Sequence, residues 1–192
     1  MAEQPAQSTA PKQLLLQKIY VKDLSFESPK APGVFNTTVT PQTQLNMRSS
    51  AREVAPNTQE VTLTLTVEAK DRDATLFLVE VAQAGIFTIQ GYNDQERAMI
   101  VGSYCPSTLY PYAREAISDV VVKGGFPQLL LQPINFDALY AQALQQRAQQ
   151  QGVQPPTMQQ ATIETQTPPS GQQDSKAADG ESPAEPKAGE TH

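Results

Sequence analysis

Few residues of this chain have the types and spacing that catalysis or metal binding requires. Its one histidine, His192, is the final residue and is far in sequence from the one cysteine, Cys105. We do not expect these two residues to meet as a Cys–His pair for nucleophilic catalysis. One histidine and one cysteine also supply too few ligands for a zinc site. Asp71 and Asp73 could pair as carboxylates, but aspartates flanking Arg72 between two strands are typical of a turn. We therefore expect no catalytic residue, no metal and no enzyme activity.

The sequence also lacks the glycine-rich loops that bind phosphate groups. Neither G-x-x-x-x-G-K-[ST] nor G-x-G-x-x-G occurs, so we expect no nucleotide and no other cofactor. The net charge of −6 argues against a nucleic-acid partner, because binding a polyanion needs clustered lysine and arginine. A single cysteine excludes the disulfide-scaffold class of secreted proteins.

The first residues, MAEQPAQSTAPKQ, are polar and do not have the charged and apolar regions of a secretory signal. No stretch approaches the roughly 18 apolar residues that a membrane-spanning helix needs. We therefore expect a cytoplasmic location and no direct membrane insertion.

Composition divides the chain into three parts. We expect a flexible N-terminus at 1–12, a folded domain at 13–149 and a disordered tail at 150–192. From 151 onwards there is no aromatic residue, and six acidic residues stand against two lysines among many prolines and glutamines. Such a segment buries too little apolar surface to offset the entropy lost on ordering.

The elements of the domain follow from its hydrophobic periodicity. Alternation of apolar and polar residues predicts strands at 14–27, 42–47, 60–69 and 75–90. Pro111 resembles a first-turn proline and Gly124 a helix stop, so one helix is predicted between them. Asn135 is an expected N-cap for a second helix. The prediction is an α+β fold, a four-stranded antiparallel sheet with two helices packed on one face.

Two short helices can cover only one face of that sheet. The face with Val79 and Val81 is the better candidate for the core. Aligned strand registers would place four residues together on the opposite face: Asp23, Glu27, Leu78 and Glu80. From periodicity alone, this face is either solvated or a docking surface. The apolar strand at 14–24 could form an edge and pair with another subunit, so we expect an oligomer.

Four strings of this chain, in order, resemble the SecB family of export chaperones. They are KIYVKDLSFESPKAPGVF (18–35), LFLVEVAQAGIFTIQG (76–91), SYCPSTLYPYAREAISD (103–119) and GGFPQLLLQPINFDAL (124–139). The resemblance implies a homotetramer, a dimer of dimers with helices between two eight-stranded sheets. It also implies ATP-independent holding of unfolded precursor proteins in the cytoplasm, and their delivery to the ATPase SecA. The resemblance also implies that no cofactor is used.

The resemblance also assigns expected roles to particular residues. The SecA-docking face of the family corresponds to Asp23, Glu27, Leu78 and Glu80, which periodicity had already grouped on one face. Positions linked to tetramer assembly correspond to Val79, Val81 and Gln83. The client groove corresponds to Leu45, Met47, Phe136, Tyr140 and Leu144, each of which could equally be an ordinary core residue.

The chain departs from the family pattern in three places. Thr38 and Val39 stand where an aromatic residue is common, which affects one wall of the groove, and Ala84 replaces a glycine of the long strand. The tail is longer than usual, and its role is open, as are the identity and affinity of any client. The alternative function is a SecB-like scaffold dedicated to one partner, for example in a toxin–antitoxin system, without general holding activity.

Overall fold

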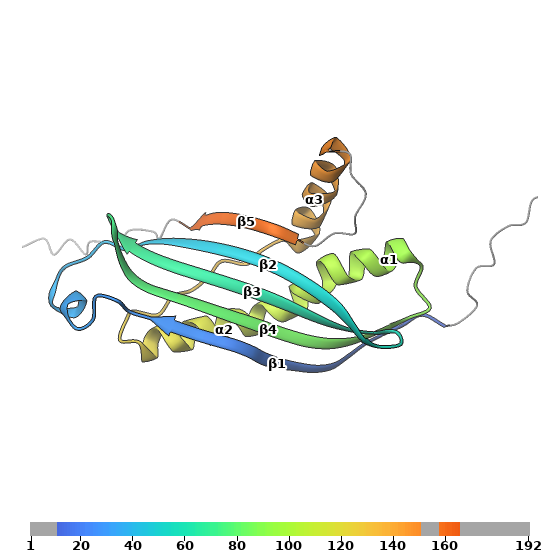
Figure 1. The fold of residues 1–192 in the computed structure, drawn as a ribbon, viewed down its shortest axis with the longest axis horizontal. Helices are drawn as coiled ribbons and strands as arrows, with labels where there is room; N and C mark the ends of the chain where they lie inside the picture. Colours follow the sequence, from blue (N-terminus) through green and yellow to red (C-terminus); the bar gives the residue numbers. More distant parts are fainter. Residues whose placement is uncertain (1–10, 151–157, 166–192) are drawn as a thin grey trace, which may run out of the picture.

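The computed structural model describes residues 11–150 and 158–165. In this part of the chain five strands form one antiparallel sheet in the order β1-β4-β3-β2-β5 (Figure 1). The strands are β1 (Gln13–Glu27), β2 (Gln42–Ala55), β3 (Thr58–Asp71), β4 (Ala74–Gln90) and β5 (Met158–Thr165). The four long strands confirm the predicted sheet.

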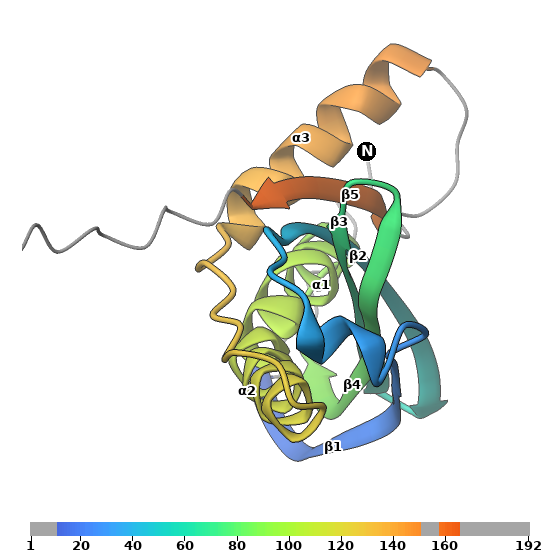
Figure 2. The same ribbon diagram turned by 90° about the vertical axis from the view of Figure 1, so that its left-hand side faces the viewer.

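Helices follow the fourth strand. The segments α1 (Asp94–Met99), η2 (Ile100–Tyr104) and α2 (Cys105–Lys123) run without interruption, and α3 (Phe136–Gln150) comes after a loop. A short helix, η1 (Gly33–Asn36), interrupts the connection from β1 to β2. Figures 1 and 2 show α2 lying along one face of the sheet, while α3 projects away from it. Within the described ranges no helix has the length and hydrophobicity to cross a membrane.

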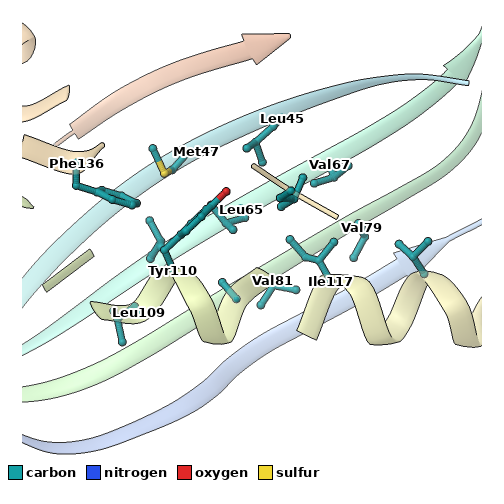
Figure 3. Packing of buried hydrophobic residues seen from close by; sticks show 14 of the residues in the cluster. Leu45, Met47, Leu65, Val67, Val79, Val81, Leu109, Tyr110, Ile117 and Phe136 are labelled. Atoms are coloured by element: carbon teal, nitrogen blue, oxygen red, sulfur yellow. The ribbon is translucent and has the colours of Figure 1, made fainter. Parts of the chain in front are cut away.

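The hydrophobic core lies between α2 and the covered face of the sheet. Alternate residues of β3 and β4 point toward α2, which the strand periodicity predicts. Figure 3 shows Leu65, Val67, Val79 and Val81 facing Leu109, Tyr110 and Ile117 of α2, and all of these residues are buried. The predicted α+β fold, with the face of Val79 and Val81 as its core side, is therefore confirmed.

The first helical segment begins earlier than the sequence predicted. Asn93 caps it by accepting a hydrogen bond from the Glu96 amide, and the Glu96 side chain accepts one from the Asn93 amide. This reciprocal capping box is a strong helix start. Pro106 is the proline at the beginning of α2, whereas Pro111 lies inside that helix, so reading Pro111 as a first-turn proline was wrong.

The π-helical turn η2 precedes Pro106. The Cys105 amide donates to the carbonyl of Ile100, five residues earlier, instead of four. A proline has no amide hydrogen and its ring crowds the preceding turn, and a wider turn relieves such crowding. α1, η2 and α2 therefore form one continuous helical element, of which α2 covers the sheet.

Two other segments differ from the prediction. β2 continues to Ala55, beyond the predicted end at Met47, because its second half pairs with the start of β3 although its side chains are exposed. Eight residues of the predicted tail form β5, which pairs with β2 between Thr43 and Ser49. The rest of the tail, at 151–157 and 166–192, lies outside the described residues, as does 1–10.

Candidate docking surfaces

The strand register brings the predicted SecA-docking residues onto one face. Glu27 lies opposite Leu78, and Ser25 lies opposite Glu80, on neighbouring strands β1 and β4. Asp23 lies opposite Ala82, two positions along the same face. Successive odd positions of β1 and even positions of β4 therefore form one patch, on the side of the sheet away from α2.

This patch, formed by Asp23, Glu27, Leu78 and Glu80, carries mainly negative charge. The Glu80 carboxylate accepts a 2.7 Å hydrogen bond from the Thr66 hydroxyl, and its other oxygen lies 3.8 Å from the Arg48 guanidinium. Neither Asp23 nor Glu27 has an ion-pair partner within the described ranges, so both carboxylates face solvent. A cationic partner could therefore approach without breaking an existing ion pair to either of them.

Glu68, which was not among the predicted docking residues, adds a further carboxylate to the same face. Its Cα is paired with Leu78 across β3 and β4. The Lys70 ammonium, which donates to Glu68 at 3.0 Å, lowers the pKa of this carboxyl, and a hydrogen bond from Thr75 adds to the effect. The alternation of threonine and glutamate along β3 was the signal that could have placed Glu68 beside the patch.

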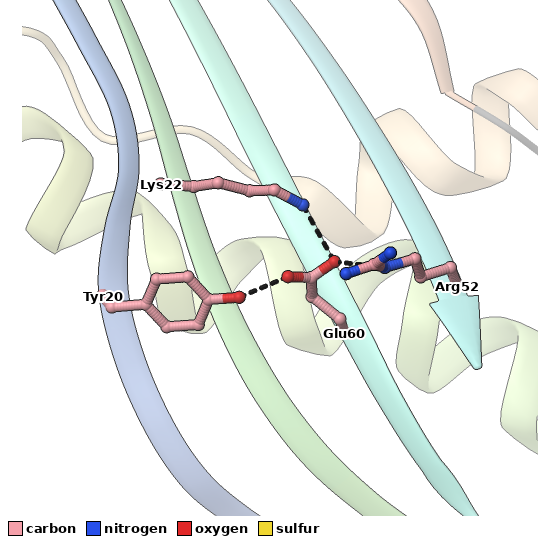
Figure 4. Close-up of polar contacts among 4 residues, drawn as sticks. All are labelled: Tyr20, Lys22, Arg52 and Glu60. Carbon is pink, nitrogen blue, oxygen red and sulfur yellow. Dashed lines mark hydrogen bonds and ion pairs between the residues drawn. The ribbon is translucent and has the colours of Figure 1, made fainter. Parts of the chain in front are cut away.

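A cluster around Glu60 lies further along the uncovered face. Tyr20, Lys22 and Arg52 all donate to the Glu60 carboxylate, from β1 on one side and β2 on the other (Figure 4). The hydrogen bonds from Tyr20 and then from Lys22 are the main causes that lower the pKa of Glu60 to about 2. Tyr20 reaches across β4 above Ala84, its register partner, whose small side chain leaves room for the ring. This cluster joins three strands, β1, β2 and β3, and we assign it a structural role.

The predicted tetramer residues lie on the opposite, covered face. Val79 and Val81 are fully buried, and Gln83 is 2% exposed. They cannot touch a second subunit directly in this arrangement. Any effect on assembly would therefore act through the position of α2, whose outer side exposes Tyr112 by about half, as the preceding turn η2 exposes Tyr104.

The predicted groove residues separate into two groups. Leu45, Met47, Phe136 and Tyr140 are buried, and Figure 3 shows Phe136 beside Met47 and Tyr110. Phe136 and Tyr110 form an edge-on aromatic pair with centroids 5.5 Å apart. Leu144 is 45% exposed on the part of α3 that projects from the body. The structure thus brings Leu45, Met47 and Phe136 together in the core, places the Tyr140 ring over Gly102, and leaves Leu144 accessible.

An aromatic cluster at the other end of the sheet was not identified from sequence. Phe77 contacts Phe126 at 4.9 Å between centroids, and Phe126 contacts Phe35 of η1 at 5.3 Å. Phe35 is 50% exposed and Leu130, in the loop after α2, is 62% exposed. The cluster joins the connection between β1 and β2 to that loop. Val39, in the position where the family often has an aromatic residue, packs against the core.

The candidates for catalysis have structural environments. Burial raises the pKa of the Cys105 thiol to about 12, so the nucleophilic thiolate is not available near neutral pH. Asp71 ends β3 and Ala74 begins β4, with Arg72 at a φ of 54° in the turn between them. His192 lies outside the described residues.

Comparison with known proteins identifies the family. The SecB family model, described as preprotein translocase subunit SecB, matches residues 6–147. The chain belongs to the SecB family. A SecB relative from Nitrosococcus oceani, named protein-export protein SecB, is 54% identical over 137 residues, which is 70% of this chain and 84% of the relative. A SecB of the same name from Hahella chejuensis is 50% identical over 144 residues, covering 74% of this chain and 91% of the relative.

A solved structure supports the SecB-like fold. It is the Mycobacterium tuberculosis SecB-like chaperone Rv1957 in complex with a peptide from the HigA1 antitoxin. It aligns with a TM-score of 0.54 and 15% identity, over 63% of this chain and 90% of that chain. At this identity the likeness extends to the fold alone. The relatives named for protein export favour an export role over the dedicated-partner alternative.

Proposed function

We propose that this chain is an ATP-independent export chaperone that holds unfolded precursor proteins in the cytoplasm and delivers them to SecA. The observation that carries the proposal is the extent of the SecB match. Relatives named for protein export share about half of their residues with this chain over most of both lengths. No catalytic step is part of the proposed mechanism.

Holding is proposed to work through several weak sites. The accessible apolar residues around Phe35 and Leu130, and Leu144 on α3, lie on different elements of one subunit. In a homotetramer, a dimer of dimers, these contacts would be repeated four times, and linked sites gain affinity through effective concentration. Binding to the unfolded state keeps slow-folding precursors unfolded by mass action.

Delivery is proposed to use the acidic patch of Asp23, Glu27, Leu78 and Glu80. Its carboxylates surround one half-buried leucine, so that a basic, partly apolar segment of SecA would be complementary to it. Complementary charge speeds encounter and sets orientation more than it adds affinity. Leu45 and Met47, which are expected to belong to the client groove, lie on the opposite side of the sheet from the patch, so a client and SecA could be bound together.

The proposal is tested by light scattering. A denatured, slow-folding precursor is diluted into buffer with this protein or with an equal mass of serum albumin, and no nucleotide is added. We expect near-stoichiometric protein to suppress aggregation and delay refolding, while albumin does neither. Failure with several unrelated unfolded chains would reject general holding activity and support the dedicated-partner scaffold.

A further inference from the structure

The strand β5 covers an edge of the sheet that would otherwise have unpaired backbone groups. Thr43 through Ser49 of β2 pair with β3 on one side and with β5 on the other. Side chains at four alternate positions of this stretch are buried: Thr43, Leu45, Met47 and Ser49. From Ser50 onward β2 has exposed side chains and, within the described ranges, no second partner. The paired stretch and the buried stretch therefore coincide.

The register gives β5 an alternating chemical pattern on this edge. Thr165, Ile163 and Ala161 stand opposite Thr43, Leu45 and Met47, the core-side row of β2. Glu164 and Thr162 stand at the intervening positions, opposite Gln44 and Asn46. An extended peptide with alternating apolar residues matches this edge, because backbone pairing gives affinity and alternate side chains give specificity.

The segment is a weak strand. Its sequence, MQQATIET, has only Met158 and Ile163 as large apolar residues, and Pro155-Pro156 and Pro168-Pro169 lie on either side of it. Glutamine, alanine and glutamate are not strong strand formers. A more apolar extended chain would therefore compete well for the same edge.

We propose that the edge of β2 at Thr43–Ser49 is a strand-addition site for extended polypeptide, occupied in cis by Met158–Thr165, which an unfolded client displaces. The inference rests on the proposed holding function, and what it adds to the groove expected from the family resemblance is the segment of this chain that occupies the strand edge. Leu45 and Met47, both predicted groove residues, lie in the paired stretch.

The tether explains why a weak strand can occupy the site. α3 ends at Gln150 and β5 starts at Met158, so a short connection keeps the segment near the edge. Joining two segments in one chain through a short linker gives an effective concentration on the order of 1 mM. At that effective concentration β5 keeps weakly binding chains off the β2 edge. A client with several apolar segments binds more tightly and displaces β5.

The test uses the full-length chain carrying Thr162→Pro and Ile163→Pro together. Amide groups of consecutive strand residues point to opposite sides, so one of the two prolines must remove an amide that faces β2. The matched control carries Gln172→Pro and Gln173→Pro, two prolines in the same tail beyond β5. Hydrogen exchange of the amides at 43–49 reports pairing, and fluorescence anisotropy reports binding of reduced, carboxymethylated α-lactalbumin as an unfolded probe.

We expect the Thr162→Pro/Ile163→Pro variant to exchange the amides at 43–49 at least tenfold faster and to bind the probe about fivefold more tightly, with the control unchanged. Equal rates of hydrogen exchange at 43–49 in the two variants would show that β5 does not pair with β2. Faster exchange with unchanged probe affinity would overturn the competition. If no variant binds the probe, the proposed holding function is rejected, and with it the displacement of β5 by clients. The hydrogen-exchange result would still decide whether β5 pairs with β2.

Discussion

Glu60 is the residue with the most strongly perturbed environment on the uncovered face. Three donors from two other strands converge on a carboxylate that is almost fully buried. A hydrogen bond to a charged group contributes about 1.5–3 kcal/mol to stability when it is measured by removing one partner. Lys22 and Arg52 are exposed, so we expect their bonds to Glu60 to contribute amounts near the lower end of that range. The cluster therefore stabilises the sheet where β1 bulges around Lys22.

Glu60→Gln is expected to lower the free energy of unfolding by about 1–2 kcal/mol at pH 7. The folded-state pKa of Glu60, about 2, lies below its ordinary value of 4.5. The stabilisation of the folded state by ionised Glu60 is therefore complete above pH 4.5 and is lost as the pH falls toward 2. Urea unfolding from pH 7 to pH 3 checks this, with exposed Glu53→Gln as the control. A difference from wild type that is independent of pH would contradict the ionic origin.

Glu80→Lys and, separately, Leu78→Gln are expected to weaken binding to SecA by at least tenfold and leave the oligomer intact. The reason is that both side chains lie on the face away from α2, where neither supports the core. Calorimetric titration with SecA and light scattering measure the two properties, and Glu53→Lys controls for the charge change. Dissociation of the oligomer by Leu78→Gln would mean that the two faces have reversed roles.

At the scale of elements, α3 is attached by a small contact. The Ser103 hydroxyl donates to Asp137 at 2.5 Å, and the Tyr140 ring packs directly over Gly102. Beyond this first part, α3 projects from the body (Figure 2). The close approach of ring and backbone requires glycine at position 102.

Gly102→Ala is expected to destabilise the fold by about 1–3 kcal/mol. The added Cβ would lie 2.4 Å from the nearest atom of the Tyr140 ring, which must then move with the start of α3. Chemical denaturation and hydrogen exchange at 136–140 measure the two effects. The control is Gly33→Ala, where a Cβ would have no atom within 4 Å. Equal stability of the two variants would show that α3 is not held at Gly102.

The elements differ in how far the sequence could predict them. β3 and β4 alternate strongly and were predicted within two residues at each end. The second half of β2 was missed because its exposed side chains have no periodic pattern, although its backbone is paired. The start of α1 was available in the capping residues Asn93 and Glu96, but the prediction began the helix at Pro111 instead. The composition of the tail concealed β5, because pairing with β2, not intrinsic preference, defines that strand.

The site residues show the same division between periodic and long-range information. A period of two was enough to group Asp23, Glu27, Leu78 and Glu80 on one face. The Glu60 cluster was not predictable, since Tyr20 is 40 residues away in sequence and meets Glu60 only through the strand order. The aromatic contact between Phe35 and Phe126 likewise joins two loops that no local pattern connects.

At the scale of the whole molecule, the two edges of the sheet differ. β1 is an edge strand with Leu15, Val21 and Leu24 each more than 40% exposed. The other edge is the short strand β5. Exposed apolar edges favour pairing with another chain, which natural proteins otherwise prevent with charge.

Val21→Lys combined with Leu24→Lys is expected to reduce the molar mass in solution by at least half. Two charges on the edge of β1 would repel the same charges on a partner and would stay solvated in a monomer. Multi-angle light scattering measures the mass, and Val54→Lys, an exposed valine on β2, is the control. An unchanged mass would place the subunit interface elsewhere, with the exposed side of α2 as the next candidate.

The unequal edges also determine how far association can proceed. If both edges of a sheet were open, the β1 edge of one copy could join the β2 edge of the next, and such head-to-tail contacts add copies without limit, as in a fibre. β5 pairs with β2 between Thr43 and Ser49, so the buried part of the β2 edge is not open to the β1 edge of another copy, and the outer edge that β5 offers instead is short. We therefore expect β5 to hinder head-to-tail growth, which is a hazard for any protein that accumulates beside unfolded chains.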